Sequence, residues 1–291
     1  FAFVTNICNA RCTFCQYPKH EGKKMVLDFE VFKKAVDDYR SEGVKAICFT
    51  PNNGDPLVDK GLLDKIRYAK DAGMEEIEFN TNGILLERGD ITDHLVQLAT
   101  RIAISLPGLE PANYKLVYGV DKAAEVERGI FKLIESKKKY KSSVTLDLEF
   151  RMDRPLDQVL QDPGMRRLRP YLDDGTIGIS DAISEMFNWS GVVGQDDLTG
   201  IMKMQEFEHP KDMLPCSRTM AALNGAVLPS GDIRVCHCGR GTNNEGRLTI
   251  GNINKKSIRE IIHGPEHRKM LKNWVNGDVP DACRNCAIYN P

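Results

Sequence analysis

Three cysteines near the start of the chain constrain its fold and chemistry more than any other feature. Cys8, Cys12 and Cys15 are separated by three and then two residues, and they follow an apolar run at residues 1–4 that predicts a strand. Thiolates at such close spacing are ligands that suit zinc or an iron–sulfur cluster. Structural zinc normally takes four protein ligands, whereas three thiolates leave one metal position open. The odd number of cysteines therefore indicates a catalytic centre with an exchangeable position.

Strand and helix patterns alternate from residue 1 to about residue 185. Strands that are separated by helices form a parallel sheet with right-handed crossovers. Six such units are too few for a closed eight-stranded barrel. The prediction is therefore an α/β fold, an open, TIM-like (β/α)6 partial barrel. Its predicted strands are residues 1–4, 46–50, 76–81, 101–106, 144–151 and 176–180.

Three of these strands alternate between apolar and polar residues. In the strand at residues 144–151, one face is entirely apolar and the other carries Thr145, Asp147, Glu149 and Arg151. Residues 76–81 and 101–106 follow the same pattern, because successive side chains of a strand point to opposite faces. If the apolar faces pack on the outer helices, the polar faces line a pocket for a polar ligand. The alternative is that some of these strands are edge strands with one face in water.

The spacing C-x-x-x-C-x-x-C, with the aromatic Phe14 before the last cysteine, resembles the signature of radical S-adenosylmethionine (SAM) enzymes. The resemblance implies that Cys8, Cys12 and Cys15 hold a 4Fe–4S cluster whose open iron binds the amino and carboxylate groups of SAM. It further implies that one electron cleaves SAM to a 5′-deoxyadenosyl radical. The fold of that family is the partial barrel predicted above.

Further segments resemble parts of the SAM site of that family. Residues 53–56, Asn-Gly-Asp-Pro, resemble its Gly-Gly-Glu-Pro segment, whose backbone and acid hold the SAM amino group, although one glycine is Asn here and the acid is shorter. Residues 80–83 end a predicted strand where the family places ribose contacts. All these positions follow strands, at the edge where α/β sheets bind ligands. The cofactor-binding residues that the resemblance implies are Phe14, Gly54, Asp55, Asn80, Asn82, Ser105 and Arg151.

A second group of cysteines lies near the end of the chain. Cys216 precedes a predicted hairpin at residues 225–236, Cys236 ends it, and Cys283 and Cys286 form a Cys-x-x-Cys pair. Four thiolates can close a metal site completely, either as a zinc ribbon or as an iron–sulfur cluster.

Residues 251–253, Gly-Asn-Ile, and a helix predicted from about residue 257 add to this pattern. The region resembles the Twitch domain, the single-cluster form of the SPASM extension of radical SAM enzymes. That resemblance implies an auxiliary 4Fe–4S cluster held by the four cysteines. The predicted domains are a radical SAM partial barrel at residues 1–191, a linker or lid at 192–213 and a Twitch/SPASM-like domain at 214–291.

The resemblance implies an enzyme that uses SAM and two 4Fe–4S clusters to abstract hydrogen from a C–H group. Single-cluster members of that subgroup act on carbohydrates and aminocyclitols, which favours a small polar substrate. As a dehydrogenase, the chain would transfer a hydroxyl proton to Asp147, Glu149 or Glu185 and an electron to the auxiliary cluster. As an epimerase, it would return a hydrogen atom from Cys238. A peptide-modifying SPASM enzyme and a non-catalytic zinc-binding protein are the remaining alternatives.

Composition limits the partners and the compartment. The net charge is −1 and no basic face is evident, which disfavours nucleic acid as a partner. No apolar run is long enough to span a membrane, and no signal peptide is visible. The nine cysteines are clustered as metal ligands are, so a reducing, cytoplasmic location is expected. The expected partners are a small-molecule substrate and an electron donor such as flavodoxin or ferredoxin, and because residue 1 is Phe, some of the native N-terminus is expected to be missing.

Overall fold

A parallel five-stranded sheet is the centre of the fold. A computed structural model of the chain describes residues 1–50, 53–210, 212–220, 225–236, 248–284, 286–287 and 289–290. Within these ranges the sheet has the order β1-β2-β3-β4-β5, all pairs parallel. This confirms the predicted α/β class. The strands are β1 (Ala46–Cys48), β2 (Glu76–Thr81), β3 (Arg101–Leu106), β4 (Thr145–Arg151) and β5 (Gly178–Ile183).

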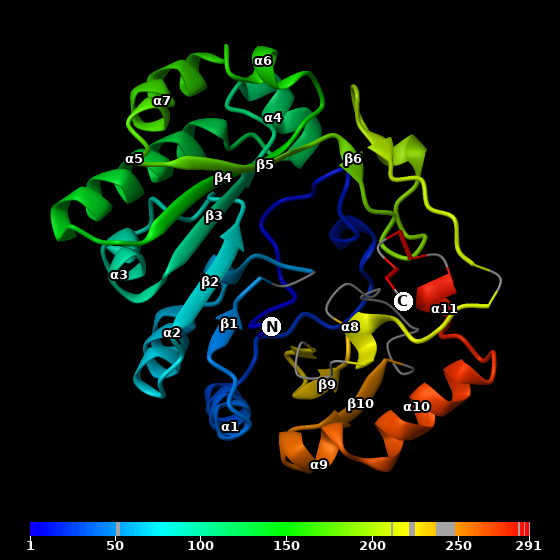
Figure 1. The fold of residues 1–291 in the computed structure, drawn as a ribbon. Coiled ribbons are helices and arrows are strands. Elements are labelled where there is room, and N and C mark those ends of the chain that lie inside the picture. Colours follow the sequence, from blue (N-terminus) through cyan, green and yellow to red (C-terminus); the bar gives the residue numbers. More distant parts are fainter. Residues whose placement is uncertain are drawn as a thin grey trace.

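Helices cover one face of this sheet, and the other face is turned toward the N-terminal segment and the C-terminal part of the chain (Figure 1). Asp28 caps the first helix by accepting hydrogen bonds from Glu30 N and Val31 N. The helices of this part are α1 (Phe29–Ser41), α2 (Leu62–Asp71), α3 (Ile91–Leu98), α4 (Pro111–Tyr118), α5 (Ala123–Tyr140), α6 (Leu156–Val159) and α7 (Pro163–Asp173).

Residues 1–4 do not form a strand of the parallel sheet, so the prediction of six strands is wrong by one. Ala2 N donates a hydrogen bond to Cys48 O at the end of β1 (2.9 Å), but Phe3 N donates to Val227 O (2.9 Å). Val227 belongs to the C-terminal part of the chain. Because successive residues bond to two different neighbours, the segment connects the two parts and extends neither as a regular strand.

The C-terminal part contains a three-stranded antiparallel sheet of β8 (Ala226–Val227), β9 (Asp232–Arg234) and β10 (Thr249–Asn252). The predicted hairpin is confirmed, because β8 and β9 pair and Gly231 takes a left-handed φ of 82° in their turn. The predicted helix begins after Ser257, whose side chain forms a capping box with Glu260. The helices here are α8 (Ser217–Met220), α9 (Ile258–Ile262), α10 (Pro265–Val275) and α11 (Asp281–Arg284).

The remaining elements are short. Two-residue strands β6 (Glu185–Met186) and β7 (Lys203–Met204) pair with each other, and 3-10 turns cover Tyr17–Lys19, Pro56–Val58 and Gln195–Asp197. The domain boundaries at residues 191 and 213 stay a prediction. Among the described residues, no helix combines the length and the apolar character needed to cross a membrane.

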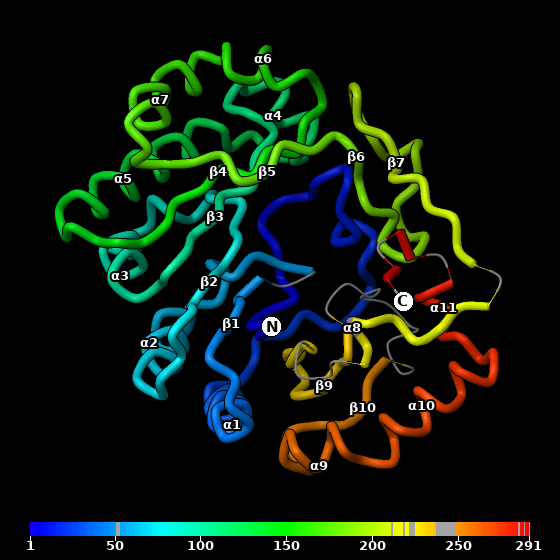
Figure 2. Tube along the Cα trace, viewed as in Figure 1, coloured from blue at the N-terminus to red at the C-terminus, as the bar shows by residue number. Residues whose placement is uncertain are grey.

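The cysteine loop (residues 8–15) lies between the parallel sheet and the C-terminal part; in Figure 2 it belongs to the dark blue trace that precedes α1. The end of α4 holds it in place, because Arg11 N donates a hydrogen bond to Tyr118 O (2.9 Å). Gly119 follows with a φ of 69°, and a Cβ at this position would lie 2.7 Å from Arg11 O. The approach of α4 to the loop therefore requires a residue without a side chain.

A Gly119→Ala variant tests this contact against a matched control, Gly175→Ala. Both glycines are left-handed, with φ of 69° and 73°, but nothing lies within 4 Å of a Cβ at Gly175. Each alanine costs about 1 kcal/mol of backbone strain. Gly119→Ala should lose about 1–3 kcal/mol more from the forced displacement of Arg11. Urea unfolding measures both losses, and equal losses would contradict the contact.

Candidate active site

The thiols of the cysteine loop lie close to one another. Burial raises the pKa of Cys12 well above its usual range, and the nearby charges of Cys15 and Cys8 raise it further. Burial also raises the pKa of Cys8 to about 12 and that of Cys15 to about 11. Buried thiols of this kind become thiolates when a metal replaces the proton. The group therefore fits iron ligation.

Two backbone N–H groups donate to the sulfur atoms of this loop. Ala10 N lies 3.5 Å from Cys8 Sγ, and Tyr17 N lies 3.4 Å from Cys15 Sγ. Such hydrogen bonds to sulfur tune iron–sulfur clusters. Asn9 Nδ2 is buried and has no partner among the described residues. The loop therefore offers both thiols and an unused donor to a bound group, which fits a cluster and its ligand.

The segment after β1, which contains Gly54 and Asp55, packs against residues 5–7, directly before the cysteine loop. Asp55 N donates a hydrogen bond to Ile7 O (2.9 Å). Gly54 has a φ of 129°, and a Cβ there would lie 2.8 Å from Thr5 O. Only glycine permits this approach of the two backbones.

The Asp55 carboxylate, in contrast, is directed into the protein. It accepts hydrogen bonds from Thr81 Oγ1 (2.8 Å), Asn82 N (2.8 Å) and Leu57 N (3.0 Å). Burial raises the pKa of Asp55 to about 6, although these hydrogen bonds act in the opposite direction. The side chain thus ties the segment to the end of β2.

Asn82 is also brought to the cysteine loop, because its Nδ2 donates to Asn9 Oδ1 (2.7 Å) and lies 3.7 Å from Cys8 Sγ. Phe14 belongs to the loop itself, and its ring contacts Tyr118 edge-on, with 5.7 Å between ring centroids. The four predicted positions Phe14, Gly54, Asp55 and Asn82 therefore lie in this loop or beside it.

Trp189 holds the same loop through its backbone. The indole Nε1 donates a hydrogen bond to Phe14 O (2.8 Å). Trp189 and the next residue, Ser190, have φ values of 49° and 58°. Left-handed backbone at two successive non-glycine residues costs free energy. Ser190 N donates a hydrogen bond to Asn188 Oδ1 (3.1 Å), which helps to stabilise this turn beside Phe14.

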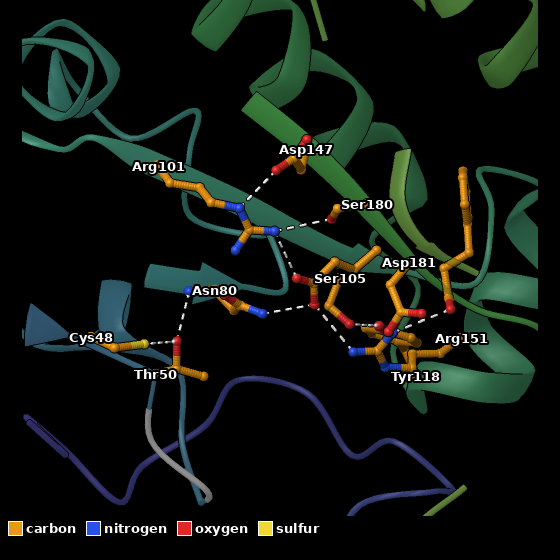
Figure 3. A network of polar contacts seen from close by, with 12 residues as sticks. Cys48, Thr50, Asn80, Arg101, Ser105, Tyr118, Asp147, Arg151, Ser180 and Asp181 are labelled. Carbon is orange, nitrogen blue, oxygen red and sulfur yellow. Dashed lines mark hydrogen bonds and ion pairs between the residues drawn. The ribbon is translucent and has the colours of Figure 1, made fainter. Parts of the chain in front are cut away.

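A network of charged residues occupies the inner face of the sheet (Figure 3). Arg101 on β3 donates to Asp147 Oδ2 (2.7 Å) and Glu149 Oε1 (3.2 Å) on β4 and to Ser180 Oγ (3.0 Å) on β5. Burial lowers the pKa of Arg101, but the hydrogen bonds to the two carboxylates outweigh it and leave the pKa raised. The alternating strand pattern thus places polar residues in the interior, as predicted.

Glu149 connects the whole network. Its Oε2 accepts hydrogen bonds from Asn80 Nδ2 (2.7 Å) on β2 and from Arg151 (3.1 Å) at the end of β4. Arg151 also binds Asp181 Oδ2 (3.2 Å) on β5. Asn80 and Arg151, which the resemblance assigns to SAM, therefore lie with the predicted catalytic residue Glu149.

Ser180 and Asp181 were not predicted as site residues. The register of β5 against β4 shifts between Leu148 and Glu149, where Ile179 pairs with Leu148 and Asp181 with Glu149. Such a bulge turns two consecutive side chains toward one face. The sequence of residues 176–180 does not indicate this bulge. A predicted strand that extended to Ile183 would have included Asp181.

Of the last two predicted positions of this part, Ser105 lies beside the network, opposite Glu149 in the pairing of β3 and β4 (Figure 3), whereas Glu185 lies apart from it. Ser105 Oγ is 2.8 Å from Tyr118 OH and so faces the end of α4 near the cysteine loop. Glu185 lies on β6, where its carboxylate pairs with Lys203 Nζ on β7 (2.9 Å) and is 54% exposed. The structure therefore does not place Glu185 with Asp147 and Glu149.

The four C-terminal cysteines form a second group. Burial raises the pKa of Cys283, and the charges of Cys236, Cys286 and Cys216 raise it further, so the four thiols are neighbours. The segment that leads to Cys216 is anchored by Trp274 Nε1, which donates to Met213 O (2.9 Å), and by the hydroxyl of Tyr289, which donates to Leu214 O (2.8 Å). Cys238, the predicted hydrogen-atom donor, lies outside the described residues.

Within the described part of the chain, no three His, Cys, Asp or Glu side chains form a group that could hold a metal ion. The choice between zinc and iron–sulfur clusters therefore rests on the family comparisons.

Comparisons with known families cover both parts of the chain. The family model described as Radical SAM superfamily matches residues 3–150, just over half of the chain. A second model, SPASM, described as an iron–sulfur cluster-binding domain, matches residues 216–287. The first model implies a 4Fe–4S cluster and SAM, and the second implies an auxiliary iron–sulfur cluster.

Curated relatives match about half of the chain. A probable GTP 3′,8-cyclase of Saccharolobus solfataricus is 31% identical over 134 residues, which are 45% of this chain and 42% of that protein. The GTP 3′,8-cyclase of Clostridium perfringens is 32% identical over 163 residues, which are 54% of this chain and 49% of that protein. The match thus spans less than half of either relative.

Solved structures resemble the whole fold. BtrN in complex with AdoMet and 2-DOIA has a TM-score of 0.60 at 17% identity, over 98% of this chain and 90% of that one. Native anSMEcpe with bound AdoMet has a TM-score of 0.59 at 14% identity, over 94% and 83%. At such low identity, these similarities concern the fold alone.

Iron content tests the two cysteine groups. With two 4Fe–4S clusters, the reconstituted chain should hold about eight irons. Replacing Cys8, Cys12 and Cys15 by Ala should leave about four, as should replacing Cys283 and Cys286. Cys48→Ser is the control, because this thiol at the end of β1 donates a hydrogen bond to Thr50 Oγ1 (3.1 Å) and is in neither cysteine group. The Cys48→Ser variant should keep all eight irons. A full complement in either multiple variant would exclude that group as ligands.

Glu149→Gln tests the network, with Glu185→Gln as the control. The change removes the charge that Arg101 and Arg151 share, and both are mostly buried there. It should cost about 2 kcal/mol of unfolding free energy. The exposed pair of Glu185 and Lys203 should contribute less than about 0.5 kcal/mol. Denaturant unfolding gives both values, and a neutral Glu149→Gln would show that the network does not stabilise the sheet.

Proposed function

The chain belongs to the radical SAM superfamily, and on that basis we propose that it is an oxidoreductase that removes hydrogen from a C–H group of a small polar substrate of the carbohydrate or aminocyclitol class. The observation that carries the proposal is the charged network on the inner face of the sheet. It begins at Arg101, the first residue of β3, and extends to Glu149, Arg151 and Asp181 toward the carboxyl-terminal ends of β4 and β5, the edge at which α/β folds bind ligands. The cysteine loop is held beside the same edge through Asn82 and Tyr118.

The charges of the network favour a substrate with hydroxyl or amino groups. Three carboxylates, those of Asp147, Glu149 and Asp181, face two guanidinium groups, those of Arg101 and Arg151. The sum of these charges is negative, so the network attracts hydrogen-bond donors and ammonium groups. A triphosphate would meet repulsion there, which separates this proposal from the activity in the names of the curated relatives.

Oxidation of a CH–OH group to a ketone removes one hydrogen atom, one proton and one electron. When bound, the cluster of the cysteine loop and SAM supply the radical that takes the hydrogen atom, and the auxiliary cluster accepts the electron. The protein must therefore provide a base for the proton. Asp147 and Glu149 are the proposed bases, and Asp181, which is 39% exposed and bound only through Oδ2, joins them as the most accessible carboxylate of the network.

The similar structures agree with more than one ligand class. BtrN was solved with AdoMet and 2-DOIA, whereas anSMEcpe was solved with AdoMet and a peptide. The negative inner network is the reason to favour the small polar ligand. The epimerase alternative depends on Cys238 and is separated from the dehydrogenase by the fate of the substrate hydrogen.

The test uses reconstituted enzyme, SAM and a reductant in D2O with a panel of aminocyclitols, sugars and peptides. A dehydrogenase should form ketone and 5′-deoxyadenosine in equal amounts, with no solvent deuterium at the reacting carbon. Cys238→Ala should leave that turnover unchanged. Deuterium at an inverted carbon, lost in Cys238→Ala, would establish the epimerase instead. Turnover of peptides alone would overturn the proposed substrate class.

A further inference from the structure

A buried cation lies at the end of the central strand of the C-terminal sheet. Arg234 is the last residue of β9, which lies between β8 and β10, and only 2% of its surface is exposed. Its guanidinium group stays protonated in proteins. Burying a charge is costly unless an opposite charge lies nearby. The position of Arg234 therefore points to a neighbouring group of negative charge.

One of the C-terminal cysteines lies on the same side of this strand. Val235 N donates a hydrogen bond to Leu248 O (3.1 Å), so the pairing of the two chain segments continues beyond Arg234. Side chains alternate along an extended segment, and residues two positions apart share a face with about 7 Å between their Cα atoms. Arg234 and Cys236 stand in this relation. The guanidinium group is thus directed to the side of the sheet on which this cysteine lies.

The electrostatics of the four C-terminal thiols agree with this placement. Burial raises the pKa of the Cys283 thiol, and the charges of the other three cysteines raise it further, whereas the charge of Arg234 lowers it. Cys283 is distant from Arg234 in the chain, so the effect arises from proximity in the fold. The cation of β9 therefore acts on the whole cysteine group and not on its sequence neighbour Cys236 alone.

A positive charge beside an iron–sulfur cluster changes its reduction potential. The cluster that four thiolates hold carries negative charge, and reduction adds one electron to it. A nearby cation stabilises the reduced form more than the oxidised form, because its attraction grows with the negative charge of the cluster. The attraction is strongest where water is excluded, and Arg234 is buried. Because the charge around a cluster helps to set its potential, the expected effect is a higher potential.

We infer that Arg234 raises the reduction potential of the auxiliary cluster and thereby makes it a better electron acceptor. The cluster itself is implied by the SPASM match. The benefit to catalysis rests on the proposed function, because oxidation of a CH–OH group leaves one electron for this cluster to accept. A redox-neutral epimerase has no such need. Arg234 acts only through the cluster, so the potential of the cluster measures its effect directly.

The test is a redox titration of the reconstituted full chain, followed by electron paramagnetic resonance. The auxiliary signal is the one that remains when Cys8, Cys12 and Cys15 are replaced by Ala. Arg234→Gln removes the charge and should lower the ratio of reduced to oxidised auxiliary cluster about tenfold at a given potential, a shift of about 59 mV for one electron. Arg234→Lys keeps the charge, and its ratio should stay within about threefold of the parent's.

A second neutral variant and a control accompany these measurements. Arg234→Met also removes the charge but keeps a long, adaptable side chain for packing, and it should lower the potential as Arg234→Gln does. Arg259→Gln is the control, because the side chain of Arg259 is 71% exposed and pairs with Glu42 (2.7 Å). Solvent screens that charge, so the potential should match the parent's. Iron content shows whether each variant keeps the auxiliary cluster.

Three results would overturn the inference. The first is a parent-like potential in Arg234→Gln or Arg234→Met at full iron content. The second is an equal shift in Arg234→Lys, which would assign the effect to packing and not to charge. The third is loss of auxiliary iron from both neutral variants, which would make Arg234 a residue that serves the fold. None of these results depends on turnover of a substrate, so a failure of the proposed dehydrogenase reaction stays distinguishable from a failure of this inference.

Discussion

The close packing of backbone against the cysteine loop is the constraint on which the rest of the site depends. Gly119 at the end of α4 and Gly54 after β1 both approach the segment at residues 5–11 at distances that exclude a side chain. Both take left-handed φ values, so the approach is built into the turns that follow α4 and β1. These contacts fix the loop relative to the sheet edge, and they therefore set where a cluster held by its thiols would lie.

The inner face of the sheet is charged, and most of its buried carboxylates are paired with guanidinium groups. Parallel strands buried on both faces usually carry apolar runs. Here β4 places Asp147 and Glu149 inside, and Arg101 and Arg151 neutralise most of that charge. A network of this kind contributes little net stability compared with apolar packing, because desolvation opposes the ion pairs. Its presence in a core position is the reason for proposing a ligand that needs polar partners.

Local patterns in the sequence predicted what local interactions decide. The alternation in residues 144–151, the cap at Asp28 and the hairpin near Gly231 all depend on neighbours within a few residues, and all are present. Residues 1–4 were wrongly predicted to be a strand of the sheet, because their hydrogen bonds go to both Cys48 and Val227, which lie far apart in sequence. Asp181 was missed for a related reason, since the bulge in β5 arises only when β4 is its neighbour. The spacing of the cysteines predicted a metal centre because the ligands of such a centre lie close together in the chain.

The hydrogen bonds of a side chain show whether it serves the fold or is left to bind a ligand. A match to a family motif does not distinguish these two roles as well. Asp55 matches a family motif, yet three donors of the chain itself bond to its carboxylate, and burial still raises its pKa to about 6. A residue can therefore keep its motif position beside the cysteine loop while its side chain bonds within the fold. The backbone of Gly54 fixes that position, because its approach to Thr5 and Ile7 leaves no room for a side chain.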